Sequence, residues 1–216
     1  MYLLMLVLFL LCALVHLWAS AARRVTLRRI TKPLLMPLLL AFYILSAARP
    51  EPLAAAALLC GFVGDVALVM PGAEEKREKP HPLLMAGLGA FALGHLCYIA
   101  VFIRGVTRWP SVWTMVLAAA ALCLLFIKIF LELRPHMGAL MPTGTAYLVV
   151  LLTMAFFAGM SGVAGGAPLR GMGGLFFILS DYILARSILL GERRCTHLAV
   201  MSTYLTAQTL LVLSLL

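Results

Sequence analysis

The sequence GGLFFILSDYILA at residues 173–185 places one carboxylate, Asp181, inside an otherwise apolar run. In a membrane-spanning helix, a charged side chain at that depth costs at least about 2.5 kcal/mol, so it needs a partner or a function. A second stretch upstream, GFVGDVAL at residues 61–68, repeats the pattern with Asp65. These two acids organise the expectations for the whole chain.

The composition predicts a membrane protein. The 216 residues are 64% hydrophobic and 12% charged, with a mean hydropathy of +1.07. Soluble domains carry about one quarter charged residues, so these values indicate a polytopic membrane protein. Apolar spans of about 20 residues use up nearly all of the chain and leave no room for a soluble domain. A single transmembrane domain over residues 1–216 is therefore expected.

The net charge and the cysteines exclude other classes. The charge of +9 is densest in residues 23–32, beside a membrane span, so contact with membrane lipids explains it better than binding to nucleic acid. The five cysteines are odd in number and form no C-x-x-C pair, which argues against disulfides and a zinc site. One deep histidine and two aspartates would make at most a sparse metal site. No metal or other cofactor is expected.

Apolar stretches predict an all-α bundle of eight transmembrane helices. They cover about 2–19, 33–48, 52–70, 82–103, 110–131, 142–160, 172–190 and 197–215. The first differs from a signal peptide because its basic residues follow the apolar core and do not precede it. Pro33 suits the first turn of the second helix. The glycine-rich segment 159–174 is interpreted as a joint.

Basic residues predict the orientation. They gather in or beside the joints after the first, third, fifth and seventh helices, which the positive-inside rule makes cytoplasmic. These residues are Arg23, Arg24, Arg28, Arg29, Lys32, Lys76, Arg77, Lys79, Arg134, Arg193 and Arg194. Both termini are then expected on the outer side of a multi-pass protein in a bacterial inner (cell) membrane.

Further polar side chains interrupt the spans, and such side chains usually face the bundle interior. Those expected to bind a substrate are Lys32, His95, Tyr98, Tyr147, Tyr204 and Gln208. His95 and Tyr98 are three residues apart, and Tyr204 and Gln208 four, so each pair shares a helix face. We expect these faces to converge on one pocket with the two acids. The other histidines lie near helix ends or in joints and receive no role: His16, His81, His136 and His197.

Each of these residues also has a structural explanation. The two acids fit a structural pair held by Lys32, tyrosine or glutamine. His95 fits two interpretations equally well: a residue of the site, or a packing residue whose hydrogen bonds are satisfied. The tyrosines and Gln208 fit hydrogen bonds between helices. Lys32 ends a basic segment and fits a lysine whose ammonium group reaches the membrane surface.

Five short motifs resemble the YhhN/TMEM86 family of integral membrane proteins, over essentially the whole chain. They are Lys32-Pro33-Leu34, Gly64-Asp65, Gly94-His95 with Tyr98, Ser180-Asp181 with Leu184-Ala185, and Tyr204 with Gln208. The resemblance implies a lysoplasmalogenase, an ether hydrolase that cleaves the vinyl ether bond of lysoplasmalogens to a fatty aldehyde and glycerophospho-ethanolamine or -choline. The proposed catalytic pair of the family corresponds to Asp65 and Asp181.

The chemistry of a vinyl ether suits two carboxyl groups. Protonation of its β-carbon creates an oxocarbenium ion, water adds, and the resulting hemiacetal collapses to an aldehyde. One carboxyl must be protonated and the other ionised, and two neighbouring buried carboxyls tend to share one proton. The roles are nearly balanced, with the deeper Asp181 favoured as the acid and Asp65 as the base. Lys32 and nearby arginines are expected to hold the phosphate of the substrate.

Two other functions stay open. Intramembrane acids are also typical of a small proton-coupled transporter, and a polar cluster can stabilise a non-catalytic lipid-binding membrane protein. The expected partners are a lysophospholipid substrate and membrane lipids, without nucleic acid. The sequence leaves a homodimer open.

Overall fold

The computed structural model describes residues 1–72, 80–106, 108–165, 167–191 and 195–216, and these ranges fold into helices alone. The elements are α1 (Tyr2–Ala21), α2 (Val25–Ser46), α3 (Pro52–Val69), α4 (Pro82–Arg104), α5 (Val112–Met137), the short 3-10 helix η1 (Gly138–Leu140), α6 (Met141–Ala164), α7 (Pro168–Leu190) and α8 (Thr196–Leu213). The prediction of an all-α chain is confirmed.

Six stretches of the described residues are long and apolar enough to cross a membrane. Five of them are α1, α2, α3, α4 and α7, and the sixth runs from Val112 to Ala164 through α5, η1 and α6. Helix α8, which carries Tyr204 and Gln208, is not among them. The chain is thus a multi-pass membrane protein, and eight separate spans stay a prediction.

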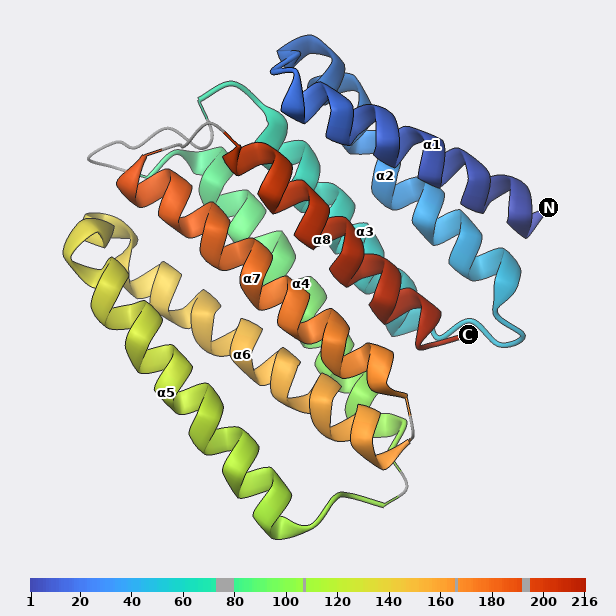
Figure 1. Ribbon diagram of the computed structural model, residues 1–216, viewed down its shortest axis with the longest axis vertical. Coiled ribbons are helices and arrows are strands. Elements are labelled where there is room, and N and C mark those ends of the chain that lie inside the picture. The colour runs from blue at the N-terminus through green and yellow to red at the C-terminus, as the bar shows by residue number, and fades with distance from the viewer. Residues whose placement is uncertain (73–79, 107, 166, 192–194) are drawn as a thin grey trace.

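Successive helices run in opposite directions, and all of them except α4 and α5 lie beside the next helix in the chain (Figure 1). The closest neighbours are α3 with α4, α7 with α8, α1 with α2, and α6 with α7. Helix α5 lies at one edge, against α6 and α7, while α1 and α2 lie at the opposite edge (Figure 1). Both chain termini are at the same end of the bundle (Figure 1), as an even number of antiparallel helices requires.

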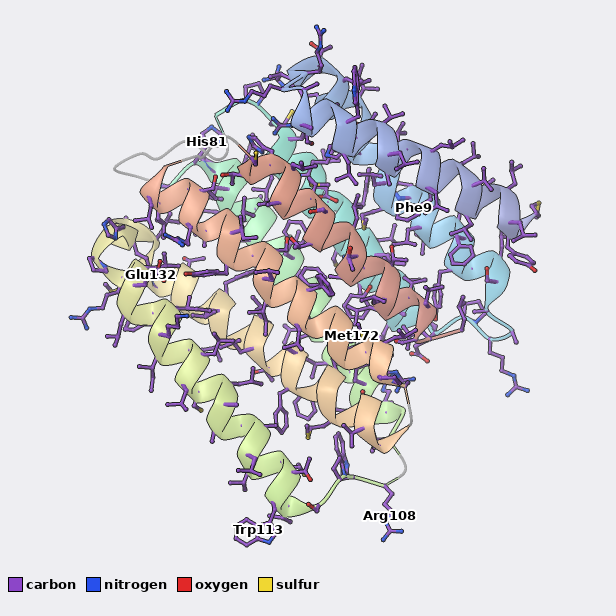
Figure 2. The ribbon with its side chains drawn as sticks, in the orientation of Figure 1. Phe9, His81, Arg108, Trp113, Glu132 and Met172 are labelled. Carbon is purple, nitrogen blue, oxygen red and sulfur yellow. The ribbon has the colours of Figure 1, made fainter. Side chains whose placement is uncertain are left out.

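The other end of the bundle is called the basic end below, after Arg23, Arg24, Arg28, Arg29 and Arg134, which lie in or beside its joints. The ends of α1, α3, α5 and α7 and the starts of α2, α4, α6 and α8 meet there (Figure 1). His81 is at this end and Arg108 at the opposite one (Figure 2). Lys76, Arg77, Lys79, Arg193 and Arg194, which also entered the orientation prediction, lie outside the described residues.

Helix α2 begins eight residues earlier than predicted, so the placement of Pro33 in its first turn was wrong. The helix starts at Val25 and contains Pro33 and Pro37. Each proline lacks an N–H and cannot donate to the carbonyl four residues before it. Membrane-spanning helices tolerate such prolines where neighbouring helices pack against them. Helices α1 and α3 pack on α2 in this way. As a result, Lys32 lies about two turns inside the helix and not at its start.

The predicted joint over 159–174 was too long, because α6 continues to Ala164 and α7 begins at Pro168. Gly173 and Gly174 are buried within α7. A Cβ atom on Gly173 would lie 2.7 Å from a methyl carbon of Leu211, and one on Gly174 would lie 3.0 Å from Cα of Ala155. These glycines therefore form a packing face where α7 approaches α6 and α8 closely.

Gly173→Ala is expected to lower the free energy of unfolding by about 1–3 kcal/mol, because the added methyl overlaps Leu211. Gly89→Ala is the matched control, since a Cβ there meets nothing within 4 Å and alanine favours the helix. Thermal unfolding of both variants in one detergent, followed by circular dichroism, tests the difference. An unchanged midpoint for Gly173→Ala would contradict the close packing of α7 on α8.

Candidate functional site

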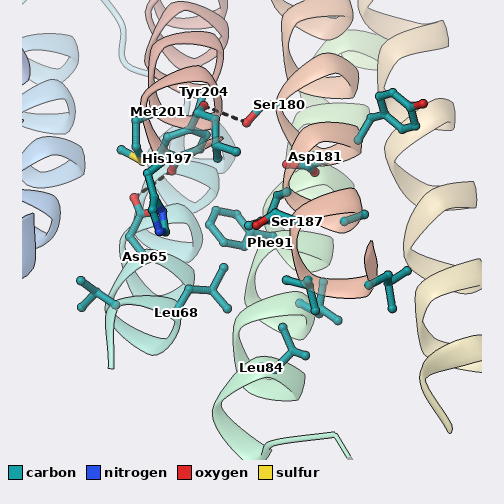
Figure 3. Close-up of a pocket in the computed structure, with 18 of the residues that line it drawn as sticks. Asp65, Leu68, Leu84, Phe91, Ser180, Asp181, Ser187, His197, Met201 and Tyr204 are labelled. Carbon is teal, nitrogen blue, oxygen red and sulfur yellow. Dashed lines mark hydrogen bonds between the residues drawn. The ribbon is translucent and has the colours of Figure 1, made fainter. Parts of the chain in front are cut away.

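A cavity of about 580 Å³ lies at the basic end of the bundle. Its size falls in the range of ligand-binding pockets, about 300–1,000 Å³. Asp65 on α3 and Asp181 on α7 both line it. They project from opposite walls, with the ring of Phe91 between them in the view of Figure 3. The two acids thus share one cavity.

Asp65 is held by side chains from two other helices. Its carboxyl group is 2% exposed, with Lys32 Nζ 3.6 Å from Oδ1. The hydroxyl of Tyr204 on α8 donates to Oδ2 at 3.0 Å. An ammonium group beside a buried carboxyl favours its ionised form. Lys32 therefore faces an acid inside the bundle, which the interpretation as a surface-reaching lysine did not anticipate.

A second layer orients Tyr204. Gln208 accepts a hydrogen bond from the Tyr98 hydroxyl at 2.8 Å and also hydrogen-bonds to the Tyr204 hydroxyl. Gly61 makes room for this contact, because a Cβ there would lie 3.2 Å from the Tyr204 oxygen and 3.3 Å from the Gln208 nitrogen. The chain from Tyr98 through Gln208 and Tyr204 thus ends on Asp65.

Asp181 has a different set of neighbours. The Tyr147 hydroxyl on α6 donates to its Oδ2 at 2.5 Å. His95 Nε2 lies 3.2 Å from that hydroxyl and 3.8 Å from the same carboxyl oxygen. Because Tyr147 donates its only proton to Asp181, its oxygen accepts from His95, and this pattern assigns the hydrogen to Nε2. Phe177 packs edge-on against the His95 ring, with centroids 4.7 Å apart.

The six predicted substrate-binding residues divide into two layers. Lys32, Tyr147 and Tyr204 line the cavity. His95, Tyr98 and Gln208 are buried behind that wall and hold the residues that line it. In the structure His95 positions Tyr147, Tyr98 and Gln208 position Tyr204, and Lys32 contacts Asp65 directly.

Sequence reasoning missed two histidines. His16 on α1 and His197 on α8 received no role, yet both line the cavity. His16 is 1% exposed, and its Nδ1 lies 2.7 Å from Oγ1 of Thr31. It looked close to a helix end because α1 was expected to stop before Ser20, whereas the helix continues to Ala21. In the sequence, the signal of a basic environment for His16 was Arg23, which follows seven residues later.

Within the described part of the chain, no three His, Cys, Asp or Glu side chains gather as a set of metal ligands. The chemistry available at this cavity is that of two carboxyl groups in different surroundings. One lies beside an ammonium group and the other at the end of a histidine and tyrosine chain. Such a pair can divide the work of a proton donor and a proton acceptor.

Comparison with known proteins gives related sequences. Residues 27–215 match the model of the YhhN family. Lysoplasmalogenase TMEM86B of Homo sapiens is 32% identical over 158 residues, which cover 73% of this chain and 61% of that protein. The Sus scrofa protein of the same name is 34% identical over the same shares. The chain thus spans about three-fifths of the length of these curated relatives. No solved structure matches it.

Proposed function

This chain belongs to the YhhN family, and from that premise we propose that it is a lysoplasmalogenase-like intramembrane hydrolase. It cleaves the vinyl ether bond of a lysoplasmalogen to a fatty aldehyde and glycerophospho-ethanolamine or -choline. The observation that carries the proposal is the pair of differently held carboxyl groups on one cavity. The relatives named lysoplasmalogenase support the choice of substrate.

The first step is proton transfer from Asp181. Its Oδ2 accepts from Tyr147, so Oδ1 carries the proton and delivers it to the β-carbon of the vinyl ether. The double bond shifts its electrons to that carbon, and the adjacent carbon and ether oxygen share the positive charge of an oxocarbenium ion. Nearby carboxylates stabilise such a cation, as in glycoside hydrolysis.

The second step is addition of water with Asp65 as the base. A carboxylate oxygen can accept more than one hydrogen bond, so ionised Asp65 can accept from a water molecule while it contacts Lys32 and Tyr204. Water adds its oxygen to the cationic carbon and gives one proton to Asp65. The hemiacetal then collapses: its hydroxyl proton leaves, the bond to the glycerol oxygen breaks, and that oxygen takes up a proton. The balance is one water consumed for one aldehyde and one alcohol.

The lining of the cavity suits an amphiphile with one chain. Apolar side chains from α5, α6 and α7 line one part of it, among them Leu133, Leu148, Leu151 and Ile178. Asp65 and the basic residues line the part nearer α2, α3 and α8, and Asp181 projects into the cavity from α7. The fatty chain occupies the apolar part, and the glycerol backbone lies at the acids. We further propose that all eight helices span a bacterial inner membrane with the basic end in the cytoplasm.

The test is aldehyde release from a lysoplasmenyl-ethanolamine by the purified protein in detergent. In D2O, the mechanism places one deuterium on the carbon next to the aldehyde carbonyl, detected by mass spectrometry after reductive trapping. A 1-O-alkyl analogue, which has no double bond to protonate, should give no aldehyde. Absence of aldehyde, together with aspartate-dependent solute uptake by proteoliposomes, would replace this proposal by the transporter.

Tyr147→Phe is expected to lower kcat by about tenfold to a hundredfold, because loss of the hydroxyl releases Asp181 from His95 and misplaces the acid. Tyr43→Phe is the matched control: it also deletes a buried tyrosine hydroxyl, which accepts from the Glu51 backbone N–H outside the cavity. Its kcat should equal that of the wild type. Equal kcat values for Tyr147→Phe and wild type would show that the Tyr147 hydroxyl does not contribute to catalysis.

A further inference from the structure

The cavity contains a basic cluster that the ether hydrolysis does not use. It consists of His16 on α1, Arg28 and Arg29 in the first turns of α2, and His197 in the first turn of α8. We propose that these four side chains form a phosphate-binding subsite. Its occupant is the phosphodiester of the lysophospholipid headgroup, an assignment that rests on the proposed function.

His16 presents one ring nitrogen to a ligand. The Thr31 hydroxyl donates to the Leu27 carbonyl at 2.8 Å, so its oxygen accepts from His16 Nδ1. This leaves Nε2, which has no hydrogen-bond partner among the described residues although the side chain is 1% exposed. A buried polar atom without a partner is unfavourable and calls for an explanation. In the neutral ring Nε2 carries no hydrogen, so a phosphate oxygen supplies the missing contact when His16 takes up a proton on Nε2 together with the ligand.

The arginines provide the charge that a phosphodiester requires. Guanidinium groups suit phosphate because they offer several N–H donors in a fixed planar arrangement. Lys32 is less suited to this task, since its ammonium group lies beside Asp65. The residues expected to hold the phosphate thus change from Lys32 with nearby arginines to the arginines with two histidines.

The cluster is continuous with the catalytic acids. His16 contacts Thr31, the residue before Lys32 in α2, and Arg28 lies one turn before Lys32 on the same helix. Lys32 in turn contacts Asp65. The order along the cavity therefore runs from the basic cluster through Lys32 to the acids. In a lysoplasmalogen the phosphate and the vinyl ether are separated by one glycerol unit, which matches two adjoining subsites.

The test measures binding without turnover. Wild-type protein in a neutral detergent is titrated with two radiolabelled lipids of equal chain length, a 1-O-alkyl-lysophosphoethanolamine and a 1-O-alkylglycerol. Neither has a bond that the proposed reaction cleaves, and they differ by the phosphoethanolamine group. The wild type is expected to bind the phospholipid at least about tenfold more tightly, as charge-assisted hydrogen bonds to phosphate imply. Inorganic phosphate alone serves as a competitor.

Two substitutions of His16 separate its nitrogens. In His16→Asn the amide nitrogen takes the place of Nδ1 and still donates to Thr31, while nothing replaces Nε2. In His16→Gln the amide nitrogen lies near the place of Nε2. The preference for the phospholipid should fall by about threefold to tenfold in His16→Asn and in Arg29→Gln, and His16→Gln should retain most of it. Arg108→Gln, exposed at the opposite end, is the charge-matched control.

Equal binding of both lipids by the wild type would overturn the subsite. So would variants that keep the wild-type melting temperature and lose affinity for both lipids equally, because the four side chains would then not recognise the phosphate. If inorganic phosphate saturates the protein and the phospholipid does not compete, the assignment to a lipid headgroup is overturned. Aldehyde release is measured on the same samples: release without a phosphate preference contradicts only the subsite, and a preference without release contradicts only the hydrolase.

Discussion

Asp181→Asn is expected to lower kcat for vinyl ether hydrolysis by about a thousandfold while the protein still binds its lysophospholipid. Asparagine keeps the shape of the side chain, and its amide oxygen can still accept from Tyr147. It has no acidic proton, however, and general acid catalysis contributes about a hundredfold to ten-thousandfold. The dissociation constant of the uncleavable alkyl lipid should stay within about threefold of the wild-type value, because no contact with the chain or phosphate changes.

Single-turnover aldehyde release and equilibrium binding together check this prediction. Retention of more than about a tenth of the wild-type rate would show that another group protonates the vinyl ether. A joint loss of rate and binding, with an unchanged melting temperature, would instead make Asp181 a binding residue.

Asp65→Asn is expected to abolish turnover to a similar extent and also to destabilise the fold. The substitution leaves Lys32, whose side chain is 13% exposed, without the carboxylate that it faces. Breaking a buried ion pair by removing one partner costs about 3–5 kcal/mol. The melting temperature in detergent should therefore fall for Asp65→Asn, in contrast to Asp181→Asn.

The double variant Asp65→Asn/Lys32→Met separates the two effects. Methionine removes the buried ammonium charge with little change in side-chain length, so stability should largely return. Activity should not return, because the base is still absent. If the double variant recovers both, the Lys32 and Asp65 contact is structural, as one interpretation of the sequence allowed, and Asp65 is not the base.

The sequence was informative where polar side chains stand out against apolar spans. Asp65, Asp181, Lys32 and Tyr147 could be placed near one another because lipid forces such groups inward. Helical spacing also predicted that Tyr204 and Gln208 act together, and the structure joins them at one hydroxyl. The sequence could not predict that His95, Tyr98 and Gln208 lie behind the residues that line the cavity. That arrangement depends on the rotation of each helix about its own axis.

Other features were hidden for physical reasons. Pro33 indicated the start of a helix. In the structure α2 continues through Pro33 with α1 and α3 packed against it, so Lys32 lies inside the helix. Glycines at 173 and 174 look alike in a joint and in a tight helix contact, and only the neighbours Leu211 and Ala155 distinguish the two. His16 could not be paired with Thr31 without the relative height of α1 and α2.

The cavity is lined by basic side chains in one part and by apolar side chains in another, and the substrate that we propose spans both parts. While the lipid is uncleaved, binding of its headgroup keeps the fatty chain close to its own contacts and the reverse also holds, so two weak interactions together give strong binding. Cleavage ends this cooperation, since the headgroup fragment prefers water and the aldehyde prefers the oily interior of the bilayer. Each fragment keeps only one attachment and leaves in its own direction. For the proposed reaction we therefore expect weak inhibition by either product and little reversal.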